Sequence, residues 1–94
     1  MAKIVKEWNG TVIEFRNGIT RAELAIDGRT VDCVDAAFLK EGKNDLLQGQ
    51  NVNGDKIQVK VTRNAVLGVK LLTYSFTAIF YFNGRKVYSE SFIF

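Results

Sequence analysis

The chain has no histidine, no proline and a single cysteine, and these absences exclude most of the common active-site chemistry. Without histidine, one chain cannot build the Ser-His or Cys-His pairs that activate a nucleophile. No phosphate-binding loop and no metal-ligand spacing stands out either. We therefore expect a protein that is not an enzyme, with no catalytic residue, no cofactor and no bound metal.

The lone cysteine, Cys33, cannot form a disulfide within the chain. Small secreted domains often carry several disulfides, so their absence favours a reducing compartment. The first residues, 1–8, contain no apolar stretch of the kind that a secretory signal requires. We expect a cytoplasmic protein. Because Cys33 lies within an apolar alternation, we also expect its side chain to be buried in the core.

The chain also lacks a large excess of charge of one sign, since it has 13 lysines and arginines and 10 acidic residues, which leave a net charge of only +3. Such a charge permits a weak attraction to anionic partners without requiring one. Five of the acids gather in the middle of the chain, but their spacing matches no calcium loop, and we expect solvated charges. These acids are Asp27, Asp32, Asp35, Glu41 and Asp45.

What the chain does have is apolar residues, which make up 47% of its 94 positions. That content suits one domain with one core, covering residues 1–94. The most apolar stretch, residues 65–82, has one charge, Lys70, and is long enough to be tested as a membrane helix. Its Thr, Tyr and Phe content and the turn signal that follows it favour a β-strand instead. We expect no membrane span.

Five Asx-Gly pairs are the strongest local signal in the sequence. A two-residue type I′ turn needs positive φ at both central positions, which Asn or Asp tolerates and Gly adopts freely. The pairs therefore predict antiparallel hairpins. They are Asn9-Gly10, Asn17-Gly18, Asp27-Gly28, Asn53-Gly54 and Asn83-Gly84.

The segments between these pairs alternate between apolar and polar residues, which is typical of strands with one buried face. We predict an all-β fold, a single-domain antiparallel β-sandwich or flattened barrel of about seven or eight short strands. The predicted strands are Lys3–Trp8, Thr11–Arg16, Thr20–Ile26, Arg29–Val34, Lys56–Arg63, Leu71–Phe82 and Lys86–Phe94.

The segment 35–51 does not show one clear pattern. Asp35 is suited to cap a short helix, so we allow at most one helix, near 34–41, although a strand or loop fits equally well. The loop signal at 41–45 and the apolar pair at 46–47 do not decide between them. A mixed α+β fold with a helix at 34–41 is the alternative architecture.

The predicted strand Leu71–Phe82 carries the main functional hypothesis. Its twelve residues would span about 40 Å, whereas a compact domain of this size is about 30 Å across. The strand should therefore bend, contain a bulge or project toward a partner. Its even positions are apolar or aromatic, and its odd positions are apolar at both ends. We predict an interface between this chain and itself or another protein, formed by Leu71, Ile79, Tyr81 and Ile93.

Two other functions stay open. A small β-barrel can bind single-stranded nucleic acid through basic and aromatic residues, here Lys56, Lys60, Arg63 and Lys70 beside nearby tyrosines. The small net charge and the acids on other strands disfavour it. A pocket for a small ligand or carbohydrate between the sheets is the third hypothesis. An aromatic-lined cavity that holds a pair of carboxylates would support it, and a solid core would exclude it.

Overall fold

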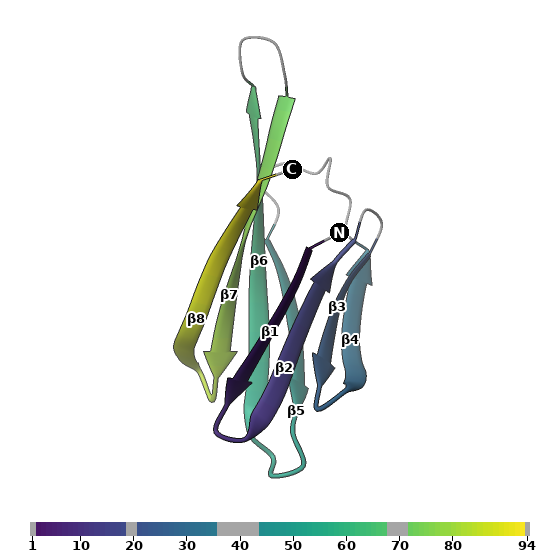
Figure 1. Cartoon of the computed structure of the whole chain (residues 1–94), viewed down its shortest axis with the longest axis vertical. Helices are drawn as coiled ribbons and strands as arrows, with labels where there is room; N and C mark the ends of the chain where they lie inside the picture. Colours follow the sequence, from purple (N-terminus) through teal and green to yellow (C-terminus); the bar gives the residue numbers. More distant parts are fainter. Residues whose placement is uncertain (1, 19–20, 36–43, 68–71, 94) are drawn as a thin grey trace.

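The computed structural model describes residues 2–18, 21–35, 44–67 and 72–93. They form two four-stranded antiparallel sheets, each a meander in chain order (Figure 1). This confirms the all-β prediction of an antiparallel sandwich. The strands are β1 (Ala2–Trp8), β2 (Thr11–Asn17), β3 (Arg21–Ile26), β4 (Arg29–Asp35), β5 (Asn44–Gln50), β6 (Lys56–Leu67), β7 (Leu72–Phe82) and β8 (Arg85–Ile93).

Three of the Asx-Gly pairs form the predicted two-residue turns. Asn9, Asp27 and Asn83 have φ values of 49°, 51° and 52°, and the glycine after each also has positive φ. In each turn the flanking residues pair directly, as Trp8 does with Thr11. The φ signature of a type I′ turn explains why Asx-Gly is used at these three points.

The other two pairs behave differently. Asn17 is the last residue of β2 and pairs with Ala22, and Gly18 donates its backbone N–H to the carbonyl of Arg21 at 2.8 Å, so this reversal follows the Asx-Gly pair and is not centred on it. Gly54, with φ of 83°, lies in a longer turn between β5 and β6. An Asx-Gly pair therefore lies at or beside a chain reversal in every case, but only three of the five pairs form the centre of a two-residue turn.

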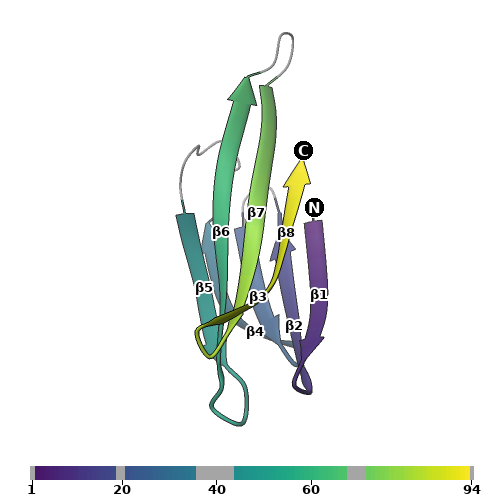
Figure 2. The ribbon, with the colours of Figure 1, turned by 90° about the vertical axis from the view of Figure 1, so that its left-hand side faces the viewer.

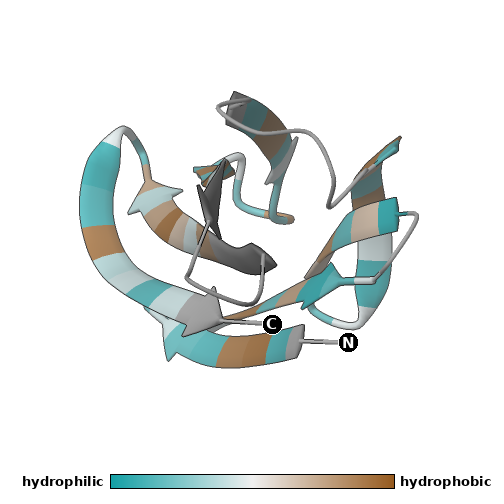
Figure 3. Ribbon diagram, turned by 90° about the horizontal axis from the view of Figure 1, so that it is seen from above, coloured by the Kyte–Doolittle hydropathy of each residue, from teal (hydrophilic) through white to brown (hydrophobic). Residues whose placement is uncertain are grey.

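The core lies between the inner faces of the two sheets. The predicted even face of β7 is buried at Phe76, Ala78, Phe80 and Phe82. Phe15 of β2 meets Phe80 edge to face, with ring centroids 6.4 Å apart, and this contact joins the sheets at their centre. Seen from above, the sheets curve around this shared interior (Figure 3). The other core residues include Ile4, Ile13, Ala22, Leu24, Ile26, Leu47, Ile57, Val59 and Val61.

The undecided segment 35–51 contains a strand that the sequence did not single out. Asn44–Gln50 is β5, an edge strand paired with β6. Leu47 is fully buried, whereas Leu46 on the other face is 47% exposed. Of the helix allowed near 34–41, Val34 and Asp35 belong to β4 instead, and 36–41 lie outside the described residues. Within the part that the structure describes, no helix has the length and hydropathy to cross a bilayer.

Cys33 is exposed, so the prediction of a buried thiol is wrong. A β-bulge shifts the β3–β4 register between Leu24 and Ala25. Beyond the bulge, Asp32 pairs with inward-facing Leu24, and Cys33 pairs with Glu23 on the outer face. Trp8 also departs from a simple core role, because 40% of its surface is exposed. One extra residue in β4 thus reversed the face that alternation assigned to the thiol.

The long strands project, which is one of the three outcomes that their length allowed. Figure 2 shows that β6 and β7 continue past the ends of the other strands. Pairing of β5 with β6 ends at Asn44–Thr62, and pairing of β7 with β8 ends at Ser75–Ile93. The molecule measures 49 × 22 × 18 Å as a result. We call the projecting two-stranded part, residues 65–67 and 72–74, the arm.

Candidate functional site

The two sheets meet along two seams, and the seam between β4 and β5 is closed. Asp32 Oδ2 accepts a hydrogen bond from the backbone N–H of Gln48 at 2.9 Å. A Cβ atom on Gly49 would lie 2.6 Å from Val31 Cγ2, so only glycine allows the strands this close. Beyond this contact a cleft of about 240 Å³ reaches Ile26 and Val52, at the end of the seam. The Val31 side chain against Gly49 and the Asp32 carboxylate on the Gln48 N–H thus close the gap between β4 and β5.

The seam between β1 and β8 is different, because two long side chains bridge it and a pocket remains beside them. The Lys6 ammonium lies 4.3 Å from the centroid of the Tyr88 ring, within the range of a cation–π contact. Beside this contact is a pocket of about 220 Å³. Its apolar wall is formed by Trp8, Ile13, Phe80, Val87 and Tyr88, with Lys6 and Glu7 completing the lining.

Tyr88 is oriented in this seam by a second contact. Its hydroxyl donates a short hydrogen bond to Glu90 Oε1, two residues further along β8. This hydrogen bond, with desolvation and the nearby negative charge, raises the pKa of the Tyr88 phenol. The Tyr88 ring also meets Phe80 edge to face, with centroids 5.8 Å apart. Tyr88 is therefore a fixed, neutral wall of the pocket.

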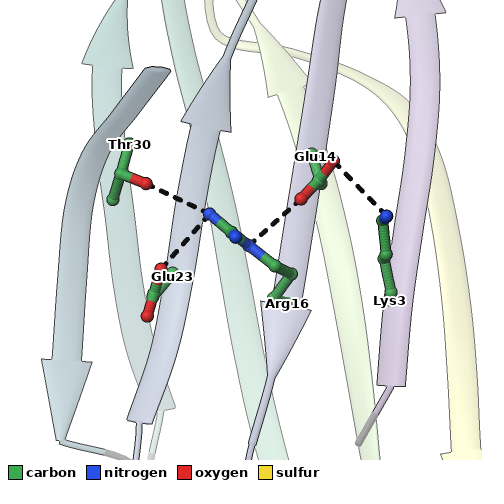
Figure 4. A network of polar contacts seen from close by, with 5 residues as sticks. All are labelled: Lys3, Glu14, Arg16, Glu23 and Thr30. Atoms are coloured by element: carbon green, nitrogen blue, oxygen red, sulfur yellow. Dashed lines mark hydrogen bonds and ion pairs between the residues drawn. The ribbon is translucent and has the colours of Figure 1, made fainter. Parts of the chain in front are cut away.

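The outer face of the first sheet carries charges that neutralise one another. Arg16 lies between two acids, with its Nε atom 3.1 Å from Glu14 and its Nη2 atom 3.2 Å from Glu23 (Figure 4). The same Nη2 donates to Thr30 Oγ1 at 3.1 Å, and Lys3 adds a looser ion pair with Glu14 at 3.9 Å. The chain of contacts crosses all four strands, so this face presents little net charge.

The outer face of the second sheet has a different composition. Lys56 and Lys60 of β6 are exposed there, and Lys86 of β8 pairs with Tyr81 of β7 on the same face. Among the described residues that register places on this face, none is acidic, because Asp45 and Glu90 pair with inward-facing partners. The remaining positions whose side chains are described are polar or apolar, namely Leu46, Gln48, Gln50, Gln58, Thr62, Thr77, Ile79, Ser89 and Ser91.

The predicted interface and nucleic-acid residues are only partly brought together. Ile79 and Tyr81 are both half-buried on the outer face of the second sheet, in the same face as Lys56 and Lys60. Two further residues are located by their backbone, Arg63 opposite Phe76 and Ile93 opposite Ser75. Leu71 and Lys70 lie outside the described residues.

Lys86 is the cation of this face that sequence reasoning missed. A register shift between Phe80 and Tyr81 brings Lys86 opposite Tyr81, although simple counting along β8 from Tyr88 would turn it inward. Bulges of this kind have no dependable sequence signal, because the one extra residue in the strand requires no particular residue types on either side of it. The only available signal was that Lys86 lies two residues after the predicted Asn83-Gly84 turn.

The arm is the second feature that extends beyond the sandwich. Its ladder pairs Ala65 with Tyr74, Val66 with Thr73 and Leu67 with Leu72. Within the described part of the chain, no third strand pairs with these six residues. Both edges of the arm therefore carry main-chain groups that no neighbouring strand among the described residues satisfies.

A polar cluster joins the sheets at the end opposite the arm. Asn51 Nδ2 donates to Thr11 Oγ1 and to Asp55 Oδ2, both at 2.9 Å, and so connects the β5–β6 turn with the first sheet. Asn83 Nδ2 donates to Asp55 Oδ1 at 3.0 Å. These hydrogen bonds favour the ionised carboxylate and lower the pKa of Asp55. The cluster holds turns together and resembles no catalytic arrangement.

Among the described residues, no group of three or more cysteines and acids is close enough to hold a metal ion. Comparison with family models, with curated proteins and with solved structures found nothing that matches the chain. The two seams, the two outer faces and the arm are therefore the candidate binding surfaces of the protein.

Proposed function

We propose that this protein is a non-enzymatic interaction module that associates with a second copy of itself through the arm. The observation that carries the proposal is that the arm strands pair only with each other among the described residues, beyond the edge of both sheets. A two-stranded ribbon alone is marginally stable in water. A third strand from a partner would satisfy its open edge.

The composition of this part of the chain supports a covered arm. Residues 64–75 include one charged residue, Lys70, whereas exposed edge strands usually carry several charges that prevent pairing. Identical arms can pair in antiparallel orientation about a two-fold axis, so that one contact is made twice. A second copy is thus the partner that the arm fits best.

The outer face of the second sheet favours contact through the arm edges over stacking of two sheets. Lys56, Lys60 and Lys86 all lie on that face, and none has an ion-pair partner among the described residues. Two copies stacked face to face would bring six ammonium groups together without compensating acids. Ile79 and Tyr81 lie on that face outside the arm, five and seven residues along β7 from Tyr74, so the arm contact does not include them.

The arm can be removed without entering the core. Deleting residues 66–73, with Ala65→Asn and Tyr74→Gly, leaves Asn64-Asn-Gly-Ser75, a two-residue hairpin of the type that three other turns already use. Analytical ultracentrifugation should show a dimer in the parent chain at rising concentration and a monomer in the shortened chain. Val52→Lys, at a 93% exposed position in the β5–β6 turn, is the control and should still dimerise.

Circular dichroism and a cooperative melt establish that the shortened chain is folded. A parent chain that stays monomeric across the micromolar to near-millimolar range contradicts the proposal. A folded, shortened chain that dimerises as strongly as the parent would also contradict it. Substituting Ile79→Lys should leave the dimer largely unchanged, because Ile79 lies five residues along β7 from the arm.

Single-stranded nucleic acid is the second candidate, and the acid-free face of the second sheet is the observation that favours it. Four-stranded sheets can present an aromatic ring on which a base stacks, with cations for the phosphates. Tyr81 lies between Gln58 and Lys86 in the register, and Lys60 is on the neighbouring position of β6. Three phosphate contacts would give a salt slope of about −2.

Filter binding of a labelled single-stranded oligonucleotide at several salt concentrations tests this second candidate. Lys60→Gln with Lys86→Gln should reduce affinity and flatten the slope, whereas Lys3→Gln on the first sheet should not. Affinity that does not depend on salt, or no binding at low salt, would dismiss it.

We infer further that the protein works in a reducing, cytoplasmic compartment. Cys33 is exposed, and the chain offers it no second cysteine as a partner. An exposed free thiol persists best where the surroundings keep thiols reduced.

A further inference from the structure

We propose that the pocket at the β1–β8 seam binds a small aromatic carboxylate. This inference is independent of the proposed self-association, because the pocket lies among Trp8, Ile13 and the residues of β8, while the arm comprises residues 65–67 and 72–74.

The residues that line the pocket suit a flat apolar group. Ile13 and Phe80, each only 1% exposed, form a floor that belongs to the core itself. Trp8 and Tyr88 stand at the sides, and Trp8 keeps 40% of its surface exposed. Large aromatic side chains that remain open beside a core opening are typical of sites that a ligand covers.

Lys6 is the group at the pocket that would hold an anion. Ile4, Lys6 and Trp8 alternate toward the inner side of β1, so Lys6 is the charged side chain that shares the pocket side with Trp8. Glu7 lines the pocket from the strand position that alternates to the outer face, opposite exposed Val12. Glu90, the other acid nearby, accepts the hydrogen bond of the Tyr88 hydroxyl.

The position of Lys6 is also defined. Its ammonium lies above the Tyr88 ring at 4.3 Å and makes no ion pair with a described acid, so the group is held in place and its charge is not neutralised. A carboxylate at the mouth of the pocket would meet this ammonium while its ring enters between Trp8 and Tyr88. The cation–π contact can persist beside the new ion pair because it uses the ring face.

The size restricts the ligand to one ring with a short chain. A pocket of about 220 Å³ is smaller than the roughly 300–1,000 Å³ that drug-sized ligands occupy. Ligands of this size bind weakly, and a dissociation constant near the millimolar range is expected. 3-Phenylpropionate is a suitable probe, since it has one ring, a two-carbon chain and a carboxylate.

Trp8 is the only tryptophan in the chain, so its fluorescence and its indole N–H resonance report directly on the pocket. Titration with 3-phenylpropionate should shift both signals in a saturable manner. 3-Phenylpropanamide and 3-phenylpropylamine keep the ring but lose or reverse the charge. We expect each of them to bind about three- to five-fold more weakly than the carboxylate, which is the preference that one partly exposed ion pair provides.

The variant Lys6→Gln should remove the preference for the carboxylate over the amide while the ring still binds. Lys86→Gln is the matched control, because it removes one lysine from the outer face of the neighbouring strand β8 and should leave the preference unchanged. Circular dichroism verifies that both variants fold. The same titration on the chain shortened at the arm should give the same result, which separates this inference from self-association.

Three results would overturn the inference. The first is no saturable change of the Trp8 signals at millimolar 3-phenylpropionate in the folded parent chain. The second is equal binding of the carboxylate, amide and amine. The third is a carboxylate preference that survives Lys6→Gln.

Discussion

The gap between the two sheets is closed in different ways at the two seams of this sandwich. At the β4–β5 seam, Gly49 lets β5 approach Val31, and Asp32 accepts a hydrogen bond from the β5 backbone. At the β1–β8 seam, Lys6 and Tyr88 bridge the gap with side chains and leave a pocket that reaches Phe80. One side of the sandwich is thus closed by the approach of Val31 to Gly49, while the other side keeps a pocket between the sheets. Adding one methyl group to each seam, or removing one bridging group, tests this difference.

The largest effect is expected from Gly49→Ala at the closed seam. The new methyl group would lie 2.6 Å from Val31 Cγ2 and 3.0 Å from its Cβ, and a β-branched side chain cannot rotate away easily. Overpacking of this kind costs about 1–3 kcal/mol of unfolding free energy, which urea denaturation would measure.

Val87→Ile adds a similar methyl group at the open seam and is the comparison for Gly49→Ala. The pocket beside Val87 can accept it, so we expect a change below about 1 kcal/mol. Equal destabilisation by the two substitutions would mean that the seams do not differ in packing.

The next effect is expected from Asp32→Ala. The Asp32 carboxylate accepts hydrogen bonds from the N–H groups of Cys33 and Gln48, at 2.8 and 2.9 Å. Its removal leaves an edge amide of β5 without this partner, at a cost of about 1–2 kcal/mol. Asp32→Asn keeps an acceptor oxygen and should cost less. Hydrogen exchange at Gln48 should accelerate in the alanine variant, and an unchanged rate there would show that the bond does not hold the seam.

The polar cluster at the turn end adds a tie that depends on pH. Folding lowers the pKa of Asp55 below its usual 3.8, so its stabilisation is complete above that value and is lost as the pH falls through the folded-state pKa. The parent chain should therefore show a steeper fall in melting temperature below pH 3.8 than Asp55→Asn. Parallel melting curves for the two chains in acid would contradict this assignment.

The smallest effect is expected at the open seam itself. Lys6→Gln removes the cation above the Tyr88 ring, an exposed contact that contributes about 0.5–1 kcal/mol. Thermal melts should differ by only a few degrees from those of the parent chain. A loss as large as that of Gly49→Ala would show that Lys6 closes the seam rather than borders a pocket.

The sequence predicted the parts of the fold that depend on neighbouring residues. Asn9-Gly10, Asp27-Gly28 and Asn83-Gly84 specify their turns because φ preferences act within two residues. The buried face of β7 followed from alternation for the same reason. β5 escaped prediction because an edge strand with Gln48, Gly49 and Gln50 has weak β-propensity and is held by β6 and Asp32 instead.

The candidate sites were less predictable than the fold. Ile79, Tyr81, Lys56 and Lys60 were identified from alternation, and the structure places all four on one face. The pocket at the β1–β8 seam was not identified from the sequence, since it combines Trp8 of the first hairpin with Tyr88 of the last. No spacing along the chain indicates that these two aromatic residues meet.

By itself, the sequence determined an all-β chain with no histidine chemistry, sharp Asx-Gly reversals and an aromatic interior. Only the tertiary structure decided which seam closes, where the bulges turn Cys33 and Lys86 outward, and how far β6 and β7 project. The reason is physical. Turn and face preferences arise from the geometry of a few adjacent residues, whereas seams, bulges and projections depend on how two sheets of unequal strand length fit together.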